Sequence, residues 1–237
     1  MFKLKDWITT DKINWNWLSC NPSALTVLEK NQDKIDWFYL SGNPSALPLL
    51  EQNQDKIDWN QLSTNPSARA LTLLENNQDK INWSQLSENP AAWAISLLEK
   101  NQDKINWYWL SGNPSALALL EKNQDKICWS QLSANPSALP LLENNQDKIY
   151  WTRLSANPSA ITLLENNQDK IDWSQLSSNT SARAIALLEK NQDKIDWFYL
   201  SSNPSAISLL ENNQDKIIWS QLSRNPAIFE RNERCDV

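Results

Sequence analysis

The chain has 237 residues, a formal net charge of −6, no histidine, 2 glycines, 3 cysteines and 14 tryptophans. Without histidine it cannot form a Ser-His-Asp or Cys-His nucleophile system, nor an imidazole metal site. Two glycines cannot supply a phosphate-binding loop or a dinucleotide fingerprint, and an acidic chain is not expected to coat nucleic acid. Composition therefore excludes several common classes of enzyme and of nucleic-acid-binding protein.

The sequence gives no sign of a membrane span or of secretion. No apolar run approaches the roughly 18 residues that a spanning helix needs, and residues 1–7 contain no apolar signal segment. Cys20, Cys128 and Cys235 are odd in number and far apart, so they do not form a disulfide framework. We therefore expect an intracellular protein with free thiols and no membrane partner.

Residues 1–10 form a degenerate half-copy of the pattern that follows, and we predict that they act as an N-terminal cap. Trp7 and Ile8 are available there to cover the first tryptophan layer. From residue 11 to residue 226 the chain consists of ten tandem copies of 22 or 24 residues, with the consensus D-K-I-x-W-x-x-L-S-x-N-P-S-A-x-x-L-L-E-x-N-Q. One tryptophan recurs in every copy, at positions 15, 37, 59, 83, 107, 129, 151, 173, 197 and 219. No linker interrupts the copies, so we predict one domain over residues 1–237, with 227–237 as a polar C-terminal cap or tail.

Within one copy, residues 33–54, the sequence predicts two short helical elements. Residues 37–40 fit one turn of α- or 3-10 helix, after an extended segment; Asp or Asn precedes the tryptophan as a cap in seven of ten copies. Asn43-Pro44-Ser45-Ala46 is typical of a helix start, and the apolar residues after it share one face. Pro48 would cost about 3 kcal/mol at the fifth helical position. We therefore expect Ser45 to cap the helix, Asn-Pro to form a corner and Asn53 to be left-handed.

Neither element can bury its apolar side alone, but stacked copies can. The predicted fold is an all-α solenoid of ten 22–24-residue repeats, each a short α-helix plus a one-turn α- or 3-10 helix, with tryptophan, isoleucine and leucine lining a continuous core. A leucine-rich-repeat-like β/α solenoid is the alternative. Three copies carry two extra residues, within 68–71, 92–95 and 182–185; because two residues are about half a helical turn, we expect the stack to bend or thicken there.

The unit W-x-x-L-S-x-N-P-x-A-x-x-L-L-E-x-N-x-D-K-I, over roughly residues 11–226, resembles tandem repeats of proteins from large double-stranded DNA viruses of algae and protists. This resemblance implies a viral or virus-derived protein, a virion component or a host-interacting factor, and it brings no known chemistry. The unit is also similar, more weakly, to leucine-rich variant repeats, which alternate an α-helix with a 3-10 helix but lack the tryptophan.

The two positions after each repeated tryptophan vary most between copies. Most copies have Ser-Gln or Asn-Gln there, as at Ser130-Gln131, which indicates a surface position. A few copies carry aromatic residues instead, and exposed aromatic clusters mark interfaces. The candidate binding residues are Trp17, Phe38, Tyr39, Tyr108, Trp109, Phe198 and Tyr199. The alternative is that these copies pack against a bend or an insert.

The remaining periodic polar residues favour structural roles. Asn-Gln-Asp-Lys recurs nine times, and one Asp per copy paired with Lys does not make a calcium loop, so we expect asparagine and aspartate to cap turns. The repeated glutamates share one environment and so do not separate into acid and base. We expect no cofactor, no metal and no catalysis. The predicted function is protein–protein interaction or structural scaffolding; binding of single-stranded nucleic acid through the aromatics is the alternative, and enzymatic activity is the least favoured.

Overall fold

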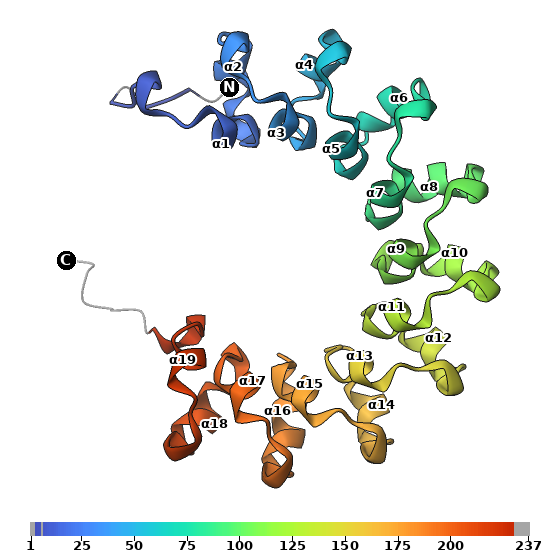
Figure 1. The fold of residues 1–237 in the computed structure, drawn as a ribbon, viewed down its shortest axis with the longest axis vertical. Coiled ribbons are helices and arrows are strands. Elements are labelled where there is room, and N and C mark those ends of the chain that lie inside the picture. Colours follow the sequence, from blue (N-terminus) through green and yellow to red (C-terminus); the bar gives the residue numbers. More distant parts are fainter. Residues whose placement is uncertain (1–2, 6, 230–237) are drawn as a thin grey trace. The chain divides into compact units, whose positions relative to one another are not determined.

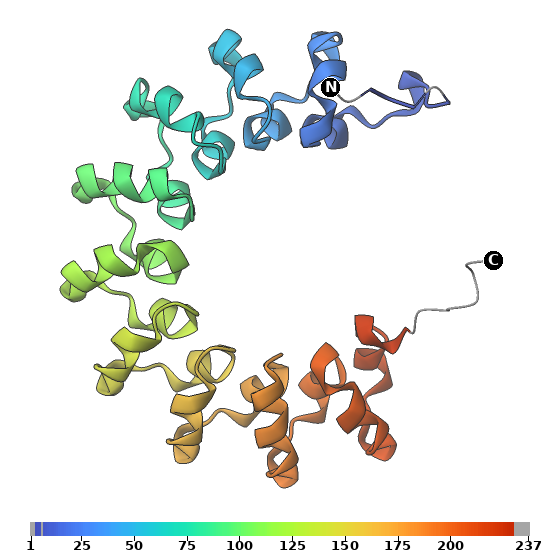
Figure 2. The ribbon, with the colours of Figure 1, turned by 180° about the vertical axis from the view of Figure 1, so that it is seen from behind.

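The computed structural model describes residues 3–5 and 7–229. Nineteen α-helices and fourteen 3-10 helices follow one another along these residues, which contain no strand (Figures 1 and 2). Within residues 3–126 and within residues 127–229, each repeat packs on the next through equivalent helices. The prediction of an all-α solenoid is confirmed, and the leucine-rich-repeat-like alternative, which requires strands, is wrong.

Each of the first nine repeats contributes two short α-helices, and the tenth contributes one within the described residues. The first begins at the repeated tryptophan, and we call these the tryptophan helices: α1 (Trp15–Ser19), α3 (Trp37–Gly42), α5 (Trp59–Thr64), α7 (Trp83–Glu88), α9 (Trp107–Gly112), α11 (Trp129–Ala134), α13 (Trp151–Ser155), α15 (Trp173–Ser178), α17 (Trp197–Ser201) and α19 (Trp219–Leu222). The second helices are α2 (Leu25–Glu29), α4 (Leu47–Gln52), α6 (Ala70–Glu75), α8 (Ala92–Lys100), α10 (Leu117–Lys122), α12 (Leu139–Glu143), α14 (Ile161–Glu165), α16 (Ala182–Glu189) and α18 (Ile207–Glu211).

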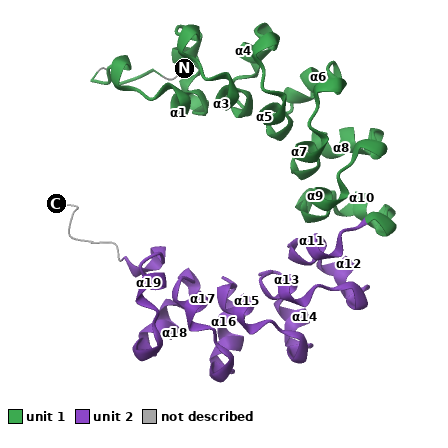
Figure 3. Cartoon of the chain, in the orientation of Figure 1, with its two compact units in different colours: residues 1–126 green, residues 127–237 purple. Residues whose placement is uncertain are grey.

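The chain divides into two compact units, residues 1–126 and residues 127–237 (Figure 3). In unit 1 the tryptophan helices α1, α3, α5, α7 and α9 pack one after another in a row, and the second helices form a second row beside them (Figure 1). In unit 2 the tryptophan helices α11 to α19 pack in the same way. Our prediction of a single domain over residues 1–237 stays a prediction.

The tryptophan helices begin where an extended residue with a capping side chain ends the preceding segment. Asp36 has φ −84° and ψ 102°, and its carboxylate accepts hydrogen bonds from the N–H groups of Phe38 and Tyr39. Cys128, Tyr150 and Ile218 occupy the same position without a side-chain cap, yet the helix still forms. The cap therefore strengthens this helix without being required for it.

The second helix begins later in the sequence than it would if Asn-Pro were its first two residues. In α4 the first helical residue is Leu47, its cap position is Ala46, and Pro48 is the second helical residue. The prediction of Ser45 as the cap is wrong by one residue, because the Asn43 side chain binds the Ser45 N–H and draws it into the corner. The corner itself is confirmed, and in some copies it closes into a 3-10 turn: η2 (Pro22–Ala24), η7 (Pro114–Ala116), η12 (Pro204–Ala206) and η14 (Pro226–Ile228).

A further 3-10 turn, absent from the predicted repeat, lies at Gln-Asp-Lys. These turns are η3 (Gln32–Lys34), η4 (Gln54–Lys56), η5 (Gln78–Lys80), η6 (Gln102–Lys104), η8 (Gln124–Lys126), η9 (Gln146–Lys148), η10 (Gln168–Lys170), η11 (Gln192–Lys194) and η13 (Gln214–Lys216); η1 (Thr10–Lys12) is the equivalent turn of the first repeat. Asn53 precedes one of them with φ −133°, so the left-handed conformation predicted for it is wrong. Its side chain instead donates to the Leu49 carbonyl at 2.9 Å, which satisfies the end of α4.

Neighbouring repeats are joined by buried side-chain hydrogen bonds. Asn65 Nδ2 donates to the carbonyls of Ser41 and Asn43 in the preceding repeat, at 3.0 and 3.2 Å. The Ser41 hydroxyl accepts the Asp58 N–H at 2.9 Å, while donating to the Trp37 carbonyl at 2.7 Å. Each repeat interface within unit 1 repeats this pattern, and we call it the Ser-Asn ladder. Because buried polar groups are costly when unpaired, the ladder fixes the register of one repeat on the next.

The core is aliphatic, and the repeated tryptophan does not belong to it. Isoleucine, leucine and alanine of the consensus are buried, as at Ile35, Leu40 and Ala46. The repeated tryptophans are instead half-buried, and Trp219 is exposed. The predicted continuous tryptophan core is therefore wrong, because the indole lies beside the core and offers a ring face to solvent.

A lysine from the next repeat covers that ring face in eight copies. Lys56 Nζ lies 4.8 Å from the centre of the Trp37 ring, and the equivalent pairs lie between 4.6 and 5.0 Å. The ring quadrupole attracts the ammonium group, and the lysine stem covers apolar surface. The Asp-Lys of the consensus thus contributes a second contact between repeats, the lysine–tryptophan contact.

The three longer copies differ in the second helix layer. Their extra residues lengthen α8 and α16 to nine and eight residues, whereas α6 has six. Side chains from the added turn reach back to the preceding repeat. Arg69 forms an ion pair with Glu51, Arg183 with Glu165, and Trp93 Nε1 donates to the Pro66 carbonyl at 3.4 Å. The expected thickening is thus present in α8 and α16, and these departures from the consensus contact the neighbouring repeat.

The two ends of the described chain are less covered than predicted. Trp7 is 78% exposed and so covers no tryptophan layer, while Ile8 is half-buried. At the other end, η14 (Pro226–Ile228) forms a 3-10 turn and Phe229 after it is exposed. Residues 230–237 of the predicted polar cap or tail, Cys235 among them, lie outside the described residues.

Candidate functional site

The candidate site consists of the aromatic residues in the first turn of four tryptophan helices, α1, α3, α9 and α17. In α3, capping by Asp36 holds the N–H groups of Phe38 and Tyr39 at 3.1 and 3.3 Å from the carboxylate oxygen. Leu40 and Ser41, in the next turn, are buried. The helix geometry therefore directs the core side chains inward and leaves the two positions after the tryptophan at the surface.

Six of the seven predicted residues are exposed. These are Trp17, Phe38, Tyr108, Trp109, Phe198 and Tyr199, and Tyr39 is half-buried. Sister copies carry polar residues at the same positions, for example Ser84-Gln85 and Ser130-Gln131. Exposure to solvent argues against the alternative in which a bend or an insert covers these rings.

The first cluster joins two neighbouring repeats. Trp17 on α1 and Tyr39 on α3 have ring centres 5.9 Å apart and planes tilted by 36°. Phe38 meets Tyr39 edge to face, with centres 5.3 Å apart and an interplanar angle of 89°. Aromatic pairs prefer such offset and edge-to-face geometries. The three rings form one apolar patch, and Trp17, at 66% exposure, contributes its most accessible side chain.

Two further pairs repeat the edge-to-face geometry within a single helix. Tyr108 and Trp109 on α9 have centres 5.1 Å apart and an interplanar angle of 88°. Phe198 and Tyr199 on α17, in unit 2, have centres 5.4 Å apart at 86°. The structure thus brings Trp17, Phe38 and Tyr39 together, and it places each of the other pairs on a helix of its own.

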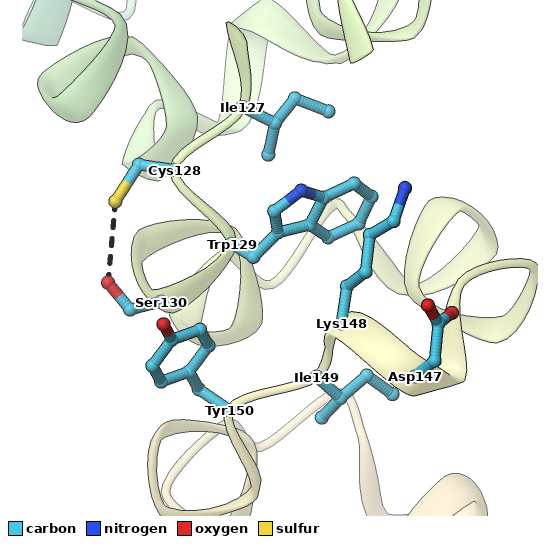
Figure 4. A pocket seen from close by; sticks show the side chains of 8 residues that line it. All are labelled: Ile127, Cys128, Trp129, Ser130, Asp147, Lys148, Ile149 and Tyr150. Carbon is cyan, nitrogen blue, oxygen red and sulfur yellow. Dashed lines mark hydrogen bonds between the residues drawn. The ribbon is translucent and has the colours of Figure 1, made fainter. Parts of the chain in front are cut away.

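A pocket of about 600 Å³ lies between two successive repeats of unit 2 (Figure 4). Trp129 and Lys148 form its wall through a lysine–tryptophan contact of 4.7 Å. Cys128 and Tyr150 line it at positions where most copies have Asp or Asn, and Cys128 Sγ lies 3.4 Å from Ser130 Oγ. The pocket is lined by one carboxylate and one amine beside apolar and neutral groups, so it offers no pair of carboxylates for acid–base chemistry.

Metal ligands do not gather anywhere in the described part of the chain. Residues 3–5 and 7–229 contain no group of three or more His, Cys, Asp or Glu side chains that could hold an ion. The aspartates of Gln-Asp-Lys are exposed and one repeat apart. In this segment the asparagine side chain donates a hydrogen bond to a carbonyl at the end of the preceding helix. The predicted capping role therefore holds for the asparagine and not for the aspartate. Within the same residues, no helix has the length and apolar character to cross a membrane.

Comparisons with protein-family models, with curated proteins and with solved structures find no match for this chain. Sequence reasoning missed two sets of residues that the structure brings to the repeat interfaces: the lysine of Asp-Lys and the serine–asparagine pair of the ladder. Both sets recur in nearly every copy, and this recurrence was the sequence signal for a contact between repeats.

Proposed function

We propose that the chain is a non-catalytic protein-binding scaffold whose recognition surface consists of the exposed aromatic residues on α1, α3, α9 and α17. The observation that carries this proposal is their exposure at positions where sister copies have serine, asparagine or threonine followed by glutamine or arginine. The core does not need these rings, because the other copies fold without them. Tyrosine and tryptophan are the residues that most often dominate binding energy at protein interfaces.

A solenoid suits this role because the copies provide a regular scaffold and individual side chains provide specificity. Replacing an aromatic pair by the Ser-Gln of a sister copy should leave the fold intact. The test variants are Phe38→Ser with Tyr39→Gln, Tyr108→Ser with Trp109→Gln, and Phe198→Ser with Tyr199→Gln. The matched control, Ser130→Ala with Gln131→Ala, changes the same two helix positions in a copy without aromatics.

The experiment compares proteins retained by the immobilised chain, from cells that express it, using quantitative mass spectrometry. Partners held by the wild type and by the control should fall at least about tenfold with the aromatic variants, which corresponds to about 1.4 kcal/mol of binding energy. An unchanged set of partners would refute the proposal. A labelled single-stranded DNA oligonucleotide provides the second measurement: salt-sensitive binding that the aromatic variants lose would favour nucleic acid as the ligand instead.

A further inference from the structure

Every repeat interface inside unit 1 joins the same hydrogen-bonding groups, and every one except that of Trp83 adds the lysine–tryptophan contact. The preceding repeat offers a serine hydroxyl, a serine carbonyl, an asparagine carbonyl and a tryptophan ring; the following repeat offers a backbone N–H, an asparagine Nδ2 and a lysine Nζ. At the junction of the second and third repeats, Asp58 N–H meets Ser41 Oγ, Asn65 Nδ2 meets the Ser41 and Asn43 carbonyls, and Lys56 covers the Trp37 ring. The interface is therefore directional, with one donor side and one acceptor side.

At the C-terminal end of the described chain, the acceptor side receives no ladder hydrogen bond and no lysine contact from the described residues. Trp219 is 63% exposed, and none of the described lysines lies over its ring. Ser223 is exposed, and its hydroxyl donates to the Trp219 carbonyl as in the other copies. Leu222 is half-buried, whereas the equivalent Leu40 is fully buried. A pocket of about 370 Å³ opens between Ile217, Trp219, Leu222 and Ile228.

The N-terminal end presents the donor side. Lys12 is exposed and lies over none of the described aromatic rings. Neither the Asn14 N–H nor Asn21 Nδ2 makes a hydrogen bond to the described residues. The equivalent groups of the later repeats in unit 1 are hydrogen-bonded to the repeat before them. Ile13 and Leu18 are half-buried, unlike their buried equivalents in later copies. Lys3 and Leu4 lie beside Leu18, where a cavity of about 160 Å³ stays unfilled, so they cover this side only in part.

We propose that the chain associates head to tail with a second copy of itself, the N-terminal side of one protomer seated on the C-terminal side of its partner. The occupant is identified by continuity with the interface that the fold already repeats. In this contact Lys12 covers the Trp219 ring, the Asn14 N–H meets Ser223 Oγ, and Asn21 Nδ2 meets the carbonyls of Ser223 and Asn225. Because the two sides differ, the contact is heterologous, so each added copy leaves both kinds of end free. A side built from one repeat is small, so the association is weak.

The test measures the mass of the 237-residue chain by sedimentation velocity and light scattering between about 10 μM and about 1 mM. The wild type should show a weight-average mass that rises with concentration. Trp219→Glu and Lys12→Glu should each weaken the association at least about tenfold. Tyr150→Glu, at an exposed aromatic residue away from both ends and outside the aromatic clusters, and Lys30→Glu are the matched controls and should behave as the wild type. Circular dichroism checks that each variant keeps its helices.

Mixing the two blocked variants separates head-to-tail association from any symmetric pairing. Trp219→Glu keeps a competent N-terminal side and Lys12→Glu a competent C-terminal side, so an equimolar mixture should form a one-to-one complex that neither forms alone. A wild type that stays monomeric at every concentration overturns the proposal. Dimers of Lys12→Glu alone overturn it as well, because they require pairing between like ends. Loss of association with Tyr150→Glu assigns the contact to a surface away from the two ends and also overturns the proposal.

Discussion

Replacing Asn65 by alanine removes three hydrogen bonds from a side chain that is 0% exposed. Nδ2 bonds the Ser41 and Asn43 carbonyls of the preceding repeat, and Oδ1 accepts the Ser67 N–H at 2.9 Å. The Asn43 carbonyl keeps a second partner, Ala46 N–H at 3.1 Å, whereas the Ser41 carbonyl keeps no other partner among the described residues. An unpaired buried carbonyl costs about 1–3 kcal/mol, and each lost hydrogen bond about 1 kcal/mol. The expected loss is roughly 3 kcal/mol.

Asn21 provides the matched control for this prediction, because it occupies the same repeat position in the first copy. Its Oδ1 accepts the Ser23 N–H at 2.9 Å, but its Nδ2 makes no hydrogen bond to the described residues. Asn21→Ala should therefore cost only about 1 kcal/mol, the value of a lost cap. The difference of about 2 kcal/mol between the two variants isolates the contribution of Nδ2, the part of the asparagine that joins one repeat to the next.

Urea unfolding followed by far-UV circular dichroism measures this difference. With a urea dependence of about 2 kcal/mol per molar, Asn65→Ala should unfold at about 1 M lower urea than Asn21→Ala. Long repeat arrays can depart from two-state unfolding, so amide hydrogen exchange should accompany the urea data. It should show faster exchange on both sides of the junction between the second and third repeats. Equal urea midpoints for the two variants would refute the assignment of the buried asparagines as the link between repeats.

Three further predictions concern single contacts. Lys56→Met should destabilise the chain by about 0.5–1 kcal/mol through loss of the contact with Trp37, whereas Lys30→Met should have no effect, as urea midpoints can show. Tyr150→Asp should stabilise the chain by about 1 kcal/mol relative to Tyr150→Ala, because it restores a missing helix cap; equal thermal midpoints would contradict this. Pro48→Ala should change the free energy of unfolding by less than about 1 kcal/mol, since Pro48 is the second helical residue; a change near 3 kcal/mol would indicate an interior proline.

The recurrence of the consensus was enough to predict the helical solenoid, since stacking is the only way for such short amphipathic elements to bury their apolar faces. Pro48 located the corner almost to the residue, because a proline inside the helix is costly. The structure placed the tryptophans differently. Repetition in every copy suggested a core role, but an indole can satisfy its contacts at the surface when a lysine covers one ring face.

The asparagine of the corner shows why other contacts escaped prediction. Asn43 Oδ1 bonds the Ser45 N–H two residues on, a local contact that sequence reading could anticipate. Its Nδ2 bonds the Ser19 carbonyl, 24 residues away, and only the stacking of repeats creates that contact. For the candidate site, comparison among copies was enough to predict surface positions. The contact between Trp17 and Tyr39 depends on how α1 packs on α3, which the consensus does not specify.

The Ser-Asn ladder affects how this chain behaves toward unrelated chains. A β-solenoid ends in a row of unpaired backbone groups, and any extended segment can add to that edge, which leads to amyloid-like growth. Residues 3–5 and 7–229 contain no strand, so this part of the protein offers no such edge. An incoming segment must instead present an amide side chain, a backbone N–H and a cation at fixed spacing to bond successive repeats. Selectivity against misassembly is thus built into the same few side chains that hold the repeats together.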